Sequence, residues 1–385
     1  MRKMRVCELI AELGPAGAER CVYELATRLD PERFDVRVVA LRGGQAADTL
    51  AEAGVEVTVL GVRGTWDVAR MCRLAGVLRE LEVDLVHTHL FQADLAGRPA
   101  ARLAAVPHLV HTVHVAEGRF RPWQFAYARL LSGCCDRIVC VSPSVCEYHL
   151  ARSGLPKSRY TVIREGIDAD AFARDNRKRM QLRRQWGIAA DQPLVAFVGR
   201  LDHQEGIETL LSAMSHLAAR GQATHLVIGG DGPKRQIIEN FIRHGEGGDY
   251  CRMLGFVNDV QAVLSAADIF AMPSRWAGFG LAAAEAMAAS LPVVAALSPG
   301  LRDIISDGET GVMIDPGDVF GLAARIEQLA HDPELRRKLG AAAREHVRQE
   351  YSVESMVAAH ERLYVEVAAD TLAPRPRAID AGWDE

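Results

Sequence analysis

The chain has 385 residues, of which 49% are apolar and 25% are charged, and its formal net charge is -5 at pH 7. This composition is typical of globular proteins, and the length favours two domains. The acidic balance excludes a nucleic-acid partner, whose phosphates require a basic field, but it permits a small phosphorylated ligand held at a local positive site.

The first segment, MRKMRVCELIAEL (1–13), begins with positive charge and becomes apolar, so a signal peptide is one interpretation. Its apolar run is short, contains Glu8 and lacks a small-residue cleavage pattern, which favours a buried first strand. The sequence has no run of about eighteen uncharged apolar residues, so we expect no membrane span. The eight cysteines include no C-x-x-C pair, and Cys140, Cys146 and His149 are only loosely clustered. We therefore expect reduced thiols, no bound metal and a cytoplasmic location.

Short apolar runs alternate with amphipathic stretches along the chain. The predicted strands of the first half, with helices such as 18–29 and 68–81 between them, are 36–41, 55–60, 84–89, 108–113 and 137–142. A charged, helix-prone stretch at 165–192 interrupts this alternation, which resumes with predicted strands at 193–200, 225–230, 250–256, 268–274 and 292–297. The pattern predicts an α/β fold of parallel sheets covered by helices on both faces.

The interruption separates two predicted Rossmann-like domains, an N-terminal domain at 1–166 and a C-terminal domain at 167–352. The C-terminal part is predicted to be helical over about 318–369, with a break near His331–Pro333. The tail at 371–385 is rich in proline and charge, and we expect it to be frayed. Ligands of open parallel sheets bind beyond the carboxyl ends of the strands, so two facing sheets predict one inter-domain cleft.

Glycines follow several of the predicted strands and are candidate donor-binding residues. They are Gly14 and Gly17, Gly199, and Gly230 and Gly232. Glycines let the backbone approach a ligand closely, and the helix that follows Gly17 offers an N-terminus that favours an anion. Arg200, directly after Gly199, has a guanidinium that can fork onto phosphate oxygens. The alternatives are plain tight turns for the glycines and a solvated surface position for Arg200.

The loop SRWAGFGL (274–281) is the most informative of these segments. Its Gly-Phe-Gly sequence opens a helix whose N-terminus can hold a diphosphate. Glu285 follows about one turn later and can accept hydrogen bonds from two ribose hydroxyls. The alternative is a solvated helix residue, but the neighbours of Glu285 are mostly Ala, Leu and Met, and a lone carboxylate in such a helix needs a partner.

Four histidines lie near the ends of two predicted strands: His87, His89, His111 and His114. A single histidine in such a place is more often a satisfied core residue than a catalyst. Two pairs on neighbouring strands favour a functional role, which we assign to His114.

The order and spacing of these loops resemble the family-four retaining glycosyltransferases, which have the GT-B fold. The resemblance covers nearly the whole chain, from GPAGAER near the start to DGETGVMIDPGD at 307–318. The shared segments between these ends are VSPSV (141–145), EGID (165–168), GRL (199–201), GGDGP (229–233), LGFVNDV (254–260) and SRWAGFGLAAAEAMA (274–288).

The resemblance implies two Rossmann-like domains whose parallel sheets face an inter-domain cleft, with the last helix, about 353–370, crossing back to the first domain. It implies a nucleoside-diphosphate sugar donor bound mainly by the C-terminal domain, and transfer with retention of anomeric configuration without a metal or cofactor. The acceptor, which is a glycan, a lipid-linked molecule or a small molecule, would bind mainly to the N-terminal domain.

Carried over to this sequence, the resemblance implies three catalytic residues. Arg200 would hold the diphosphate, Glu285 the ribose, and His114 would lie beside the donor sugar. The loop from Gly14 to Gly17 and the amides of Phe279, Gly280 and Leu281 would support the phosphates.

Three positions depart from the family pattern. Glu205 stands where the family has Lys, Ala277 where it has the first Glu of its Glu-x7-Glu motif, and Glu165 where Asn is frequent. A charge about 4 Å from a phosphate contributes roughly 4 kcal/mol at an effective dielectric near 20, so Lys to Glu turns attraction into repulsion. Either Glu205 turns away, or a nearby cation compensates, or donor handling is impaired; the nearby cations are His203, Lys234 and Arg275. The alternative to an enzyme is therefore an impaired GT-B protein that binds sugar nucleotides or serves as a partner subunit.

The stretch GRFRPWQFAYARLL (118–131) mixes Arg with aromatic residues. Two interpretations stay open, a helix that packs its aromatic stripe inward and an interfacial helix that contacts a lipid or acceptor. The second would place the protein at the inner face of a membrane as a peripheral protein. The run RDNRKRMQLRR (174–184) favours a solvated helix.

Overall fold

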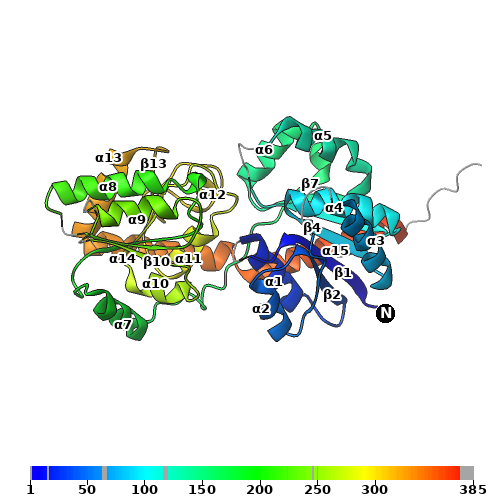
Figure 1. The fold of residues 1–385 in the computed structure, drawn as a ribbon, viewed down its shortest axis with the longest axis horizontal. Coiled ribbons are helices and arrows are strands. Elements are labelled where there is room, and N and C mark those ends of the chain that lie inside the picture. Colours follow the sequence, from blue (N-terminus) through cyan, green and yellow to red (C-terminus); the bar gives the residue numbers. More distant parts are fainter. Residues whose placement is uncertain are drawn as a thin grey trace, which may run out of the picture.

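The computed structural model describes residues 2–14, 17–62, 67–115, 120–222, 224–244, 247–248 and 250–372. These residues form two α/β lobes that lie side by side (Figure 1). The last helix, α15 (Val353–Leu372), lies with the N-terminal lobe although it is farthest along the chain (Figure 1). None of the helices in the described part of the chain is long and apolar enough to cross a membrane.

The N-terminal lobe is built on a parallel sheet of seven strands in the order β3-β2-β1-β4-β5-β6-β7. Its strands are β1 (Met4–Glu12), β2 (Phe34–Arg42), β3 (Glu56–Val59), β4 (Leu85–His89), β5 (His108–Val113), β6 (Arg137–Cys140) and β7 (Tyr160–Val162). The helices between them are α1 (Gly17–Arg28), α2 (Ala46–Glu52), α3 (Val68–Glu80), α4 (Leu90–Leu103), α5 (Pro122–Leu130) and α6 (Pro143–Ser153). Because β1 lies between β2 and β4, the strand order reverses there, and ligands bind beyond the carboxyl ends of strands at such a point.

The C-terminal lobe is built on a parallel sheet of six strands in the order β10-β9-β8-β11-β12-β13. Its strands are β8 (Leu194–Val198), β9 (His225–Gly229), β10 (Cys251–Gly255), β11 (Ile269–Met272), β12 (Val293–Ala296) and β13 (Val312–Ile314). Its helices are α7 (Asn176–Trp186), α8 (Ile207–Ala219), α9 (Arg235–Arg243), α10 (Val260–Ala266), α11 (Leu281–Ala288), α12 (Leu301–Ile304), α13 (Val319–His331) and α14 (Pro333–Glu350).

The predicted fold class is confirmed, since both sheets are parallel and lie in Rossmann-like lobes. Each apolar run predicted as a strand coincides with or overlaps one, and the predicted break in the C-terminal helices falls between α13 and α14. Two strands were missed, β7 and β13, because each has only three residues and no alternating pattern. The expected frayed tail lies outside the described residues from position 373 onward.

The chain crosses between the lobes twice, at two segments that lie side by side. Ile167 N donates to the carbonyl of Tyr351 at 2.7 Å, and Ile167 and Ser352 form an isolated parallel bridge. Gly166 allows this approach, because a Cβ at that position would lie 2.5 Å from Val353 Cα. Beyond the crossing, α15 packs on α1, and its Tyr364 joins a buried cluster with residues of the first sheet.

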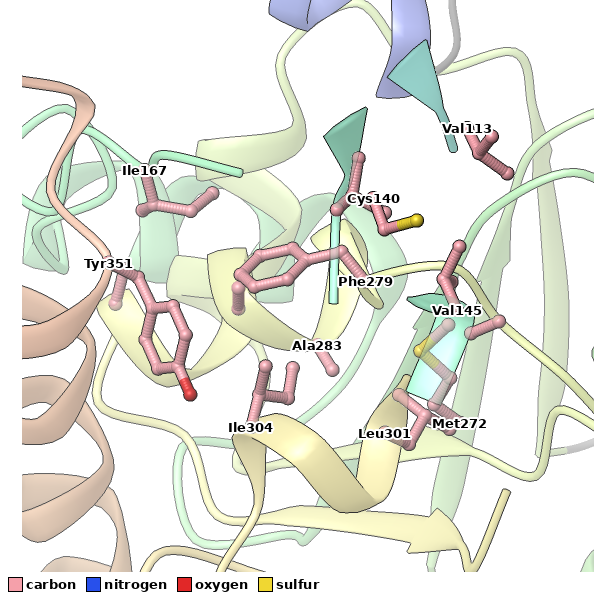
Figure 2. Close-up of a cluster of buried hydrophobic side chains, with 14 of the residues drawn as sticks. Val113, Cys140, Val145, Ile167, Met272, Phe279, Ala283, Leu301, Ile304 and Tyr351 are labelled. Carbon is pink, nitrogen blue, oxygen red and sulfur yellow. The ribbon is translucent and has the colours of Figure 1, made fainter. Parts of the chain in front are cut away.

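One hydrophobic cluster extends across both lobes (Figure 2). From the N-terminal lobe it contains Val113, Cys140 and Val145, which meet side chains of the C-terminal lobe such as Phe279 and Leu301. Burial of apolar side chains stabilises by about 25 cal/mol per Å² removed from water, so this shared core holds the lobes in contact.

Candidate active site

Glycines on both sides let the two lobes approach. Gly278, in the loop after β11, has no room for a side chain, since a Cβ there would overlap the carbonyl oxygen of His114. The carbonyl of Gly278 accepts a hydrogen bond from Ser142 Oγ at 3.0 Å. Gly17, the first residue of α1, lies against α11, because a Cβ there would be 3.7 Å from Leu281 Cδ2. The carboxyl ends of the two sheets therefore face each other.

A polar contact joins the lobes at the start of α6. The backbone N and the Oγ of Ser144 each donate a hydrogen bond of 2.9 Å to the carboxylate of Asp303. Arg302 Nε donates to Ser144 Oγ at 2.9 Å. Asp303 thus lies at a helix N-terminus, where a negative charge is favoured.

Arg200 lies in the loop after β8 with a side chain that is 68% exposed. Its guanidinium is 3.7 Å from the carboxylate of Asp202, and exposed ion pairs of this kind contribute little. The guanidinium is therefore accessible to a phosphate.

The glycines near Arg200 have a structural explanation that needs no ligand. Gly230 and Gly232 have φ angles of +139° and +153°, which favour glycine. A Cβ on Gly230 would overlap the carbonyl oxygen of Gly199, and one on Gly232 would lie 2.5 Å from Leu201 O. The two strand-end loops are also joined by a hydrogen bond of 3.0 Å from Gly199 N to the carbonyl of Gly229. These glycines let the loops pack together and so set the position of Arg200.

The loop that opens α11 turns its side chains into the protein. Phe279 is 2% exposed, and its ring packs edge-on against Tyr351 with centroids 5.3 Å apart (Figure 2). Ala277 is buried as well. Gly280 adopts φ +94° as the N-cap of α11, where a Cβ would meet Leu301. From Ala277 to Gly280, the loop can therefore reach a ligand only through its backbone.

Glu285 is partly buried in α11 among alanines, as its sequence context indicates. Burial raises the pKa of its carboxyl to about 7, and the positive charge of Arg20 partly opposes this rise. Arg20 belongs to α1 of the other lobe and forms an ion pair of 2.6 Å with Glu24. Glu285 thus faces the N-terminal lobe, and its carboxyl group makes no hydrogen bond to any side chain or backbone group among the described residues.

His114 belongs to a buried chain of hydrogen bonds in the N-terminal lobe. Its Nδ1 lies 2.8 Å from Glu165 Oε1 and its Nε2 lies 3.0 Å from His89 Nδ1. His89 Nε2 lies 2.7 Å from Glu8 Oε2, and Tyr364 of α15 donates to Glu8 Oε1 at 3.0 Å. This chain of hydrogen bonds links Glu165, at the domain boundary, to Tyr364 of the last helix.

The arrangement of donors in this chain determines where the protons lie. Neighbouring histidines hold the pKa of Glu8 well below its usual range, and burial lowers that of His89 to about 3, so Glu8 is ionised and His89 neutral. His89 then donates from Nε2 to Glu8 and accepts at Nδ1 from His114 Nε2–H. One further proton must lie between His114 Nδ1 and Glu165. Both ring nitrogens of His114 are thus occupied within the protein.

His111 lies apart from this chain. It pairs with Thr88 in the β4–β5 ladder, on the opposite face from His87 and His89, and its Nδ1 lies 2.9 Å from Thr88 Oγ1. Of the four histidines near these strand ends, His87, His89 and His114 therefore lie together and His111 does not. Strand alternation explains the exception, since successive side chains point to opposite faces.

Among the described residues, two buried groups could offer metal ligands, Cys21 with His89 and His114, and Glu8 with His87 and His89. Within each group the ligand atoms lie within 4.8 Å of one another. The separation of 2.7 Å between His89 Nε2 and Glu8 Oε2 is that of a hydrogen bond. Two tetrahedral zinc ligands would be about 3.3 Å apart at zinc–ligand bonds of about 2.0 Å. The spacing fits a hydrogen-bonded network better than a metal centre.

Two family models match the chain, each over one lobe. Residues 15–171 match the model described as Glycosyltransferase Family 4, and residues 178–346 match Glycosyl transferases group 1. A D-inositol 3-phosphate glycosyltransferase of Xylanimonas cellulosilytica is 32% identical over 297 residues, 70% of each chain. The glycogen synthase of Mycobacterium tuberculosis is 27% identical over 379 residues, 92% of this chain and 83% of that protein.

The chain belongs to the family-four glycosyltransferases. Among solved structures, HepE from Anabaena in complex with UDP-glucose superposes with a TM-score of 0.86 at 21% identity, over 94% of this chain and all of that one. The family and the GT-B fold inferred from the sequence are both confirmed.

Glu205, at the family's Lys position, does not turn outward. It is buried, and it accepts hydrogen bonds from Ser274 Oγ at 2.6 Å and from Gln204 Nε2 at 2.8 Å. Burial raises the pKa of its carboxyl, while these hydrogen bonds and the charge of Arg200 oppose the rise. Of the cations considered as compensation, Lys234 is paired with Glu208 at 2.6 Å. The charge of Arg200 favours the ionised form of Glu205.

Two charged residues of α1 in this glycosyltransferase, Glu19 and Arg20, were not predicted as site residues from the sequence. Glu19 is buried and accepts a hydrogen bond from the backbone of Gly14. A positive charge on His114 favours the ionised form of its carboxyl. Burial raises the pKa of its carboxyl. Arg20 faces Glu285. The signal was present as charged residues in the first turn of the helix after the glycine loop, where side chains reach the strand ends. Pro15 and Ala16 of that loop lie outside the described residues.

Proposed function

We propose that this glycosyltransferase moves a sugar from a nucleoside-diphosphate sugar to a hydroxyl acceptor with retention of anomeric configuration. Residues 167–352 would bind the donor, and residues 1–166 together with the helix at about 353–370 would bind the acceptor. The observation that carries the proposal is Glu285, an acid without a hydrogen-bond partner in the described chain, in an apolar helix at the boundary of the lobes. A carboxylate there gains by accepting hydrogen bonds from ribose hydroxyls.

The proposed chemistry is stabilisation of the leaving group. Departure of a nucleoside diphosphate places charge on phosphate oxygens, and fixed donors that meet this charge lower the barrier. Arg200, exposed and always charged, and the backbone amides at the start of α11 would serve as these donors. His114 has both ring nitrogens occupied, so it would act by holding its loop and backbone carbonyl beside the sugar rather than as a base.

Glu165 is an acid near the site where the first Glu of the family's Glu-x7-Glu motif is replaced by Ala277. Its Oε1 is held by His114, whereas its Oε2 lies near Gly17, within 3.8 Å of a Cβ built there. Ala277, at the vacant acid position, directly precedes Gly278, which contacts His114. We propose that Glu165 Oε2 accepts a hydrogen bond from a donor-sugar hydroxyl in place of the missing Glu.

Thermal shifts with UDP, GDP, ADP and their sugar derivatives test the donor site, since a ligand that binds the folded state raises Tm. We expect at least one nucleotide to bind and Glu285→Gln to weaken it about tenfold. The exposed acid Glu334, changed in the same way, is the matched control. Nucleotide binding that Glu285→Gln leaves unchanged would overturn the role of Glu285. NMR of the first-formed anomer tests retention.

The buried acid at position 205 supports a second candidate, an impaired GT-B protein that binds sugar nucleotides or serves as a partner subunit. This candidate predicts nucleotide binding without release of nucleoside diphosphate from any sugar nucleotide, over a range of acceptors. Measured release in the presence of an acceptor would exclude it.

We also propose a cytoplasmic location with peripheral membrane contact through α5. Trp123 and Leu130 of this helix are 51% and 82% exposed, whereas Phe125 is buried, so the aromatic stripe is divided between the two interpretations. Residues 118 and 119 of the stretch lie outside the described chain. Flotation with anionic vesicles tests the contact, and Trp123→Ser with Leu130→Ser should abolish it. Equal flotation of this variant would exclude α5 as the contact.

A further inference from the structure

A cavity of about 180 Å³ lies in the N-terminal lobe, between α4, α5, α6 and the carboxyl ends of β4 and β5. Its lining joins His114 and Val115 to Arg98 of α4 and His149 of α6. Because His114 also contacts the C-terminal lobe at Gly278, the cavity extends from the domain boundary into the N-terminal lobe. It therefore lies on the acceptor side of the proposed reaction.

Arg98 lines this cavity and has one side-chain donor without a partner in the described chain. Its side chain is fully buried, with Nε donating to Asp94 Oδ1 at 2.8 Å and Nη1 donating to the carbonyls of Ala128 and Leu131 at 3.2 Å. Its Nη2 is buried without a hydrogen-bond partner in the described chain. An unpaired buried donor costs free energy, and more so on a charged group. A ligand oxygen placed there would remove that cost.

The polar groups of the cavity carry no net charge. Asp94 balances Arg98 at 2.8 Å. Burial lowers the pKa of His111 to about 4 and that of His149 to about 3, so both rings are neutral at pH 7. An uncharged oxygen therefore suits Arg98 Nη2 better than a phosphate or carboxylate, which would bury an unbalanced charge.

Aromatic rings form part of the cavity wall, at Phe91, Phe120, Phe125 and Tyr160. Phe120 and Phe125 pack edge-on with centroids 6.0 Å apart, and Phe125 meets the ring of His149 at 5.3 Å. Among the described lining residues, the buried side-chain polar atoms that lack a partner are Arg98 Nη2 and His149 Nε2. These two atoms match a ring that carries few oxygens, since each buried hydroxyl left unpaired is costly. A cavity of about 150 Å³ holds one benzene ring.

We propose that this cavity binds the end group of the acceptor, an uncharged six-membered ring with one oxygen toward Arg98 and a hydroxyl toward His114. This inference rests on the proposed glycosyl transfer. The hydroxyl oxygen forms the new bond to the anomeric carbon as the bond from that carbon to the diphosphate breaks. The electron pair of the broken bond leaves with the nucleoside diphosphate, and the hydroxyl proton passes to the departing phosphate oxygen.

Three probes separate the features of the site, with the full chain observed by saturation-transfer NMR. 4-Methoxyphenol has both oxygens, 4-methylphenol lacks the one that would meet Arg98, and methyl glucoside represents a polar ring. We expect 4-methoxyphenol to bind about tenfold more tightly than 4-methylphenol, since a hydrogen bond to a charged donor is worth that much. Methyl glucoside is expected to bind weakest. Equal binding of all three would overturn the proposal.

A pair of variants on α5 locates the binding site. Ala128 lines the cavity and Ala126 is exposed on the same helix. Ala128→Leu should fill the space and weaken 4-methoxyphenol at least about tenfold, whereas Ala126→Leu should leave its affinity within about twofold. Both variants keep Arg98, and an unchanged Tm shows that each folds. Unchanged binding to Ala128→Leu would place the ligand elsewhere and overturn the proposal.

Failure of this inference differs from failure of the proposed function. If the cavity is the acceptor site, 4-methoxyphenol accelerates release of nucleoside diphosphate, and Ala128→Leu removes the acceleration without changing nucleotide affinity. Binding of the phenol without acceleration, while nucleotide still binds, would overturn the acceptor role alone. Absence of any nucleotide binding would instead overturn the proposed function.

Discussion

The two lobes share an architecture but differ in what their sheets bury. In the C-terminal lobe the central strands β8, β11 and β12 are apolar, and buried polar residues such as Glu205 and Ser274 lie in loops. In the N-terminal lobe, buried titratable side chains lie on the strands themselves, at Glu8 of β1 and at His87 and His89 of β4. Buried polar groups are costly unless paired, so their concentration in one lobe marks where this glycosyltransferase is specialised.

The proposed function gives this difference a meaning. The C-terminal lobe, with its apolar sheet and glycine-packed loops, would be the donor-binding half. Acceptor choice would then depend on the polar interior and the cavity of the N-terminal lobe.

Among the predictions that test this difference between the lobes, removal of the Glu8 carboxylate should have the largest effect, a loss of stability. Glu8→Ala leaves His89 and Tyr364 buried without their ionised partner, and we expect a loss of about 3–5 kcal/mol in the free energy of unfolding. Urea unfolding measures it. Glu12 on the same strand is about half exposed and paired with Arg42, so Glu12→Ala should cost less than about 1 kcal/mol. Equal losses in the two variants would contradict a specialised buried network.

Mild acid should destabilise the N-terminal lobe first. The folded-state pKa values of His89, His111 and His149 are lowered to about 3, 4 and 3, whereas the unfolded value is about 6.5. Below pH 6.5 the unfolded chain binds more protons than the folded one. The free energy of unfolding therefore decreases as the pH is lowered, by up to about 1.4 kcal/mol per pH unit for each group. In the described C-terminal lobe, His225 is the histidine with a lowered pKa.

Hydrogen exchange at pH 7 and pH 5 checks this prediction. Amides of β4 and β5 should lose more protection than those of β11 and β12. A uniform loss in both lobes would show that the buried histidines do not set the acid response.

Replacing Glu205 by the lysine of the family pattern should strengthen binding of the donor nucleotide. Glu205→Lys exchanges a buried acid beside Arg200 for a positive charge, so we expect about tenfold tighter binding of a nucleoside diphosphate. Adding Ala277→Glu should favour the sugar nucleotide over the nucleotide alone. Isothermal titration measures both affinities. Unchanged affinities in correctly folded variants would show that Glu205 does not weaken the donor site.

Glu165→Asn should have the smallest effect. It introduces the residue frequent in the family and removes the acid near Gly17. We expect a sugar nucleotide to bind about threefold more weakly, with nucleotide affinity unchanged. A matching loss for the nucleotide alone would indicate a structural role for Glu165.

Most of the fold could be predicted from local sequence patterns. Alternating apolar runs predicted the longer strands because side-chain direction along a strand has a period of two, and the glycines marked the strand-end loops. The spacing of these loops was sufficient for the family. The three-residue strands β7 and β13 escaped because so short a segment has no detectable period.

The site was only partly accessible from the sequence. Arg200, Glu285 and His114 were selected by their positions after strands, and their roles stay predictions. The partners of these residues come from elsewhere in the chain. Arg20 lies opposite Glu285 from the other lobe, and Glu165 holds a nitrogen of His114.

By itself the sequence determined the two parallel sheets, the loops at their carboxyl ends and the family, because those properties reside in short-range periodicity and spacing. Tertiary structure alone decided that Tyr364 of α15 meets Glu8 of β1 and that Glu205 is buried against Ser274. Such contacts depend on strand register and on how two lobes pack, and both are set by the whole core rather than by neighbours along the chain.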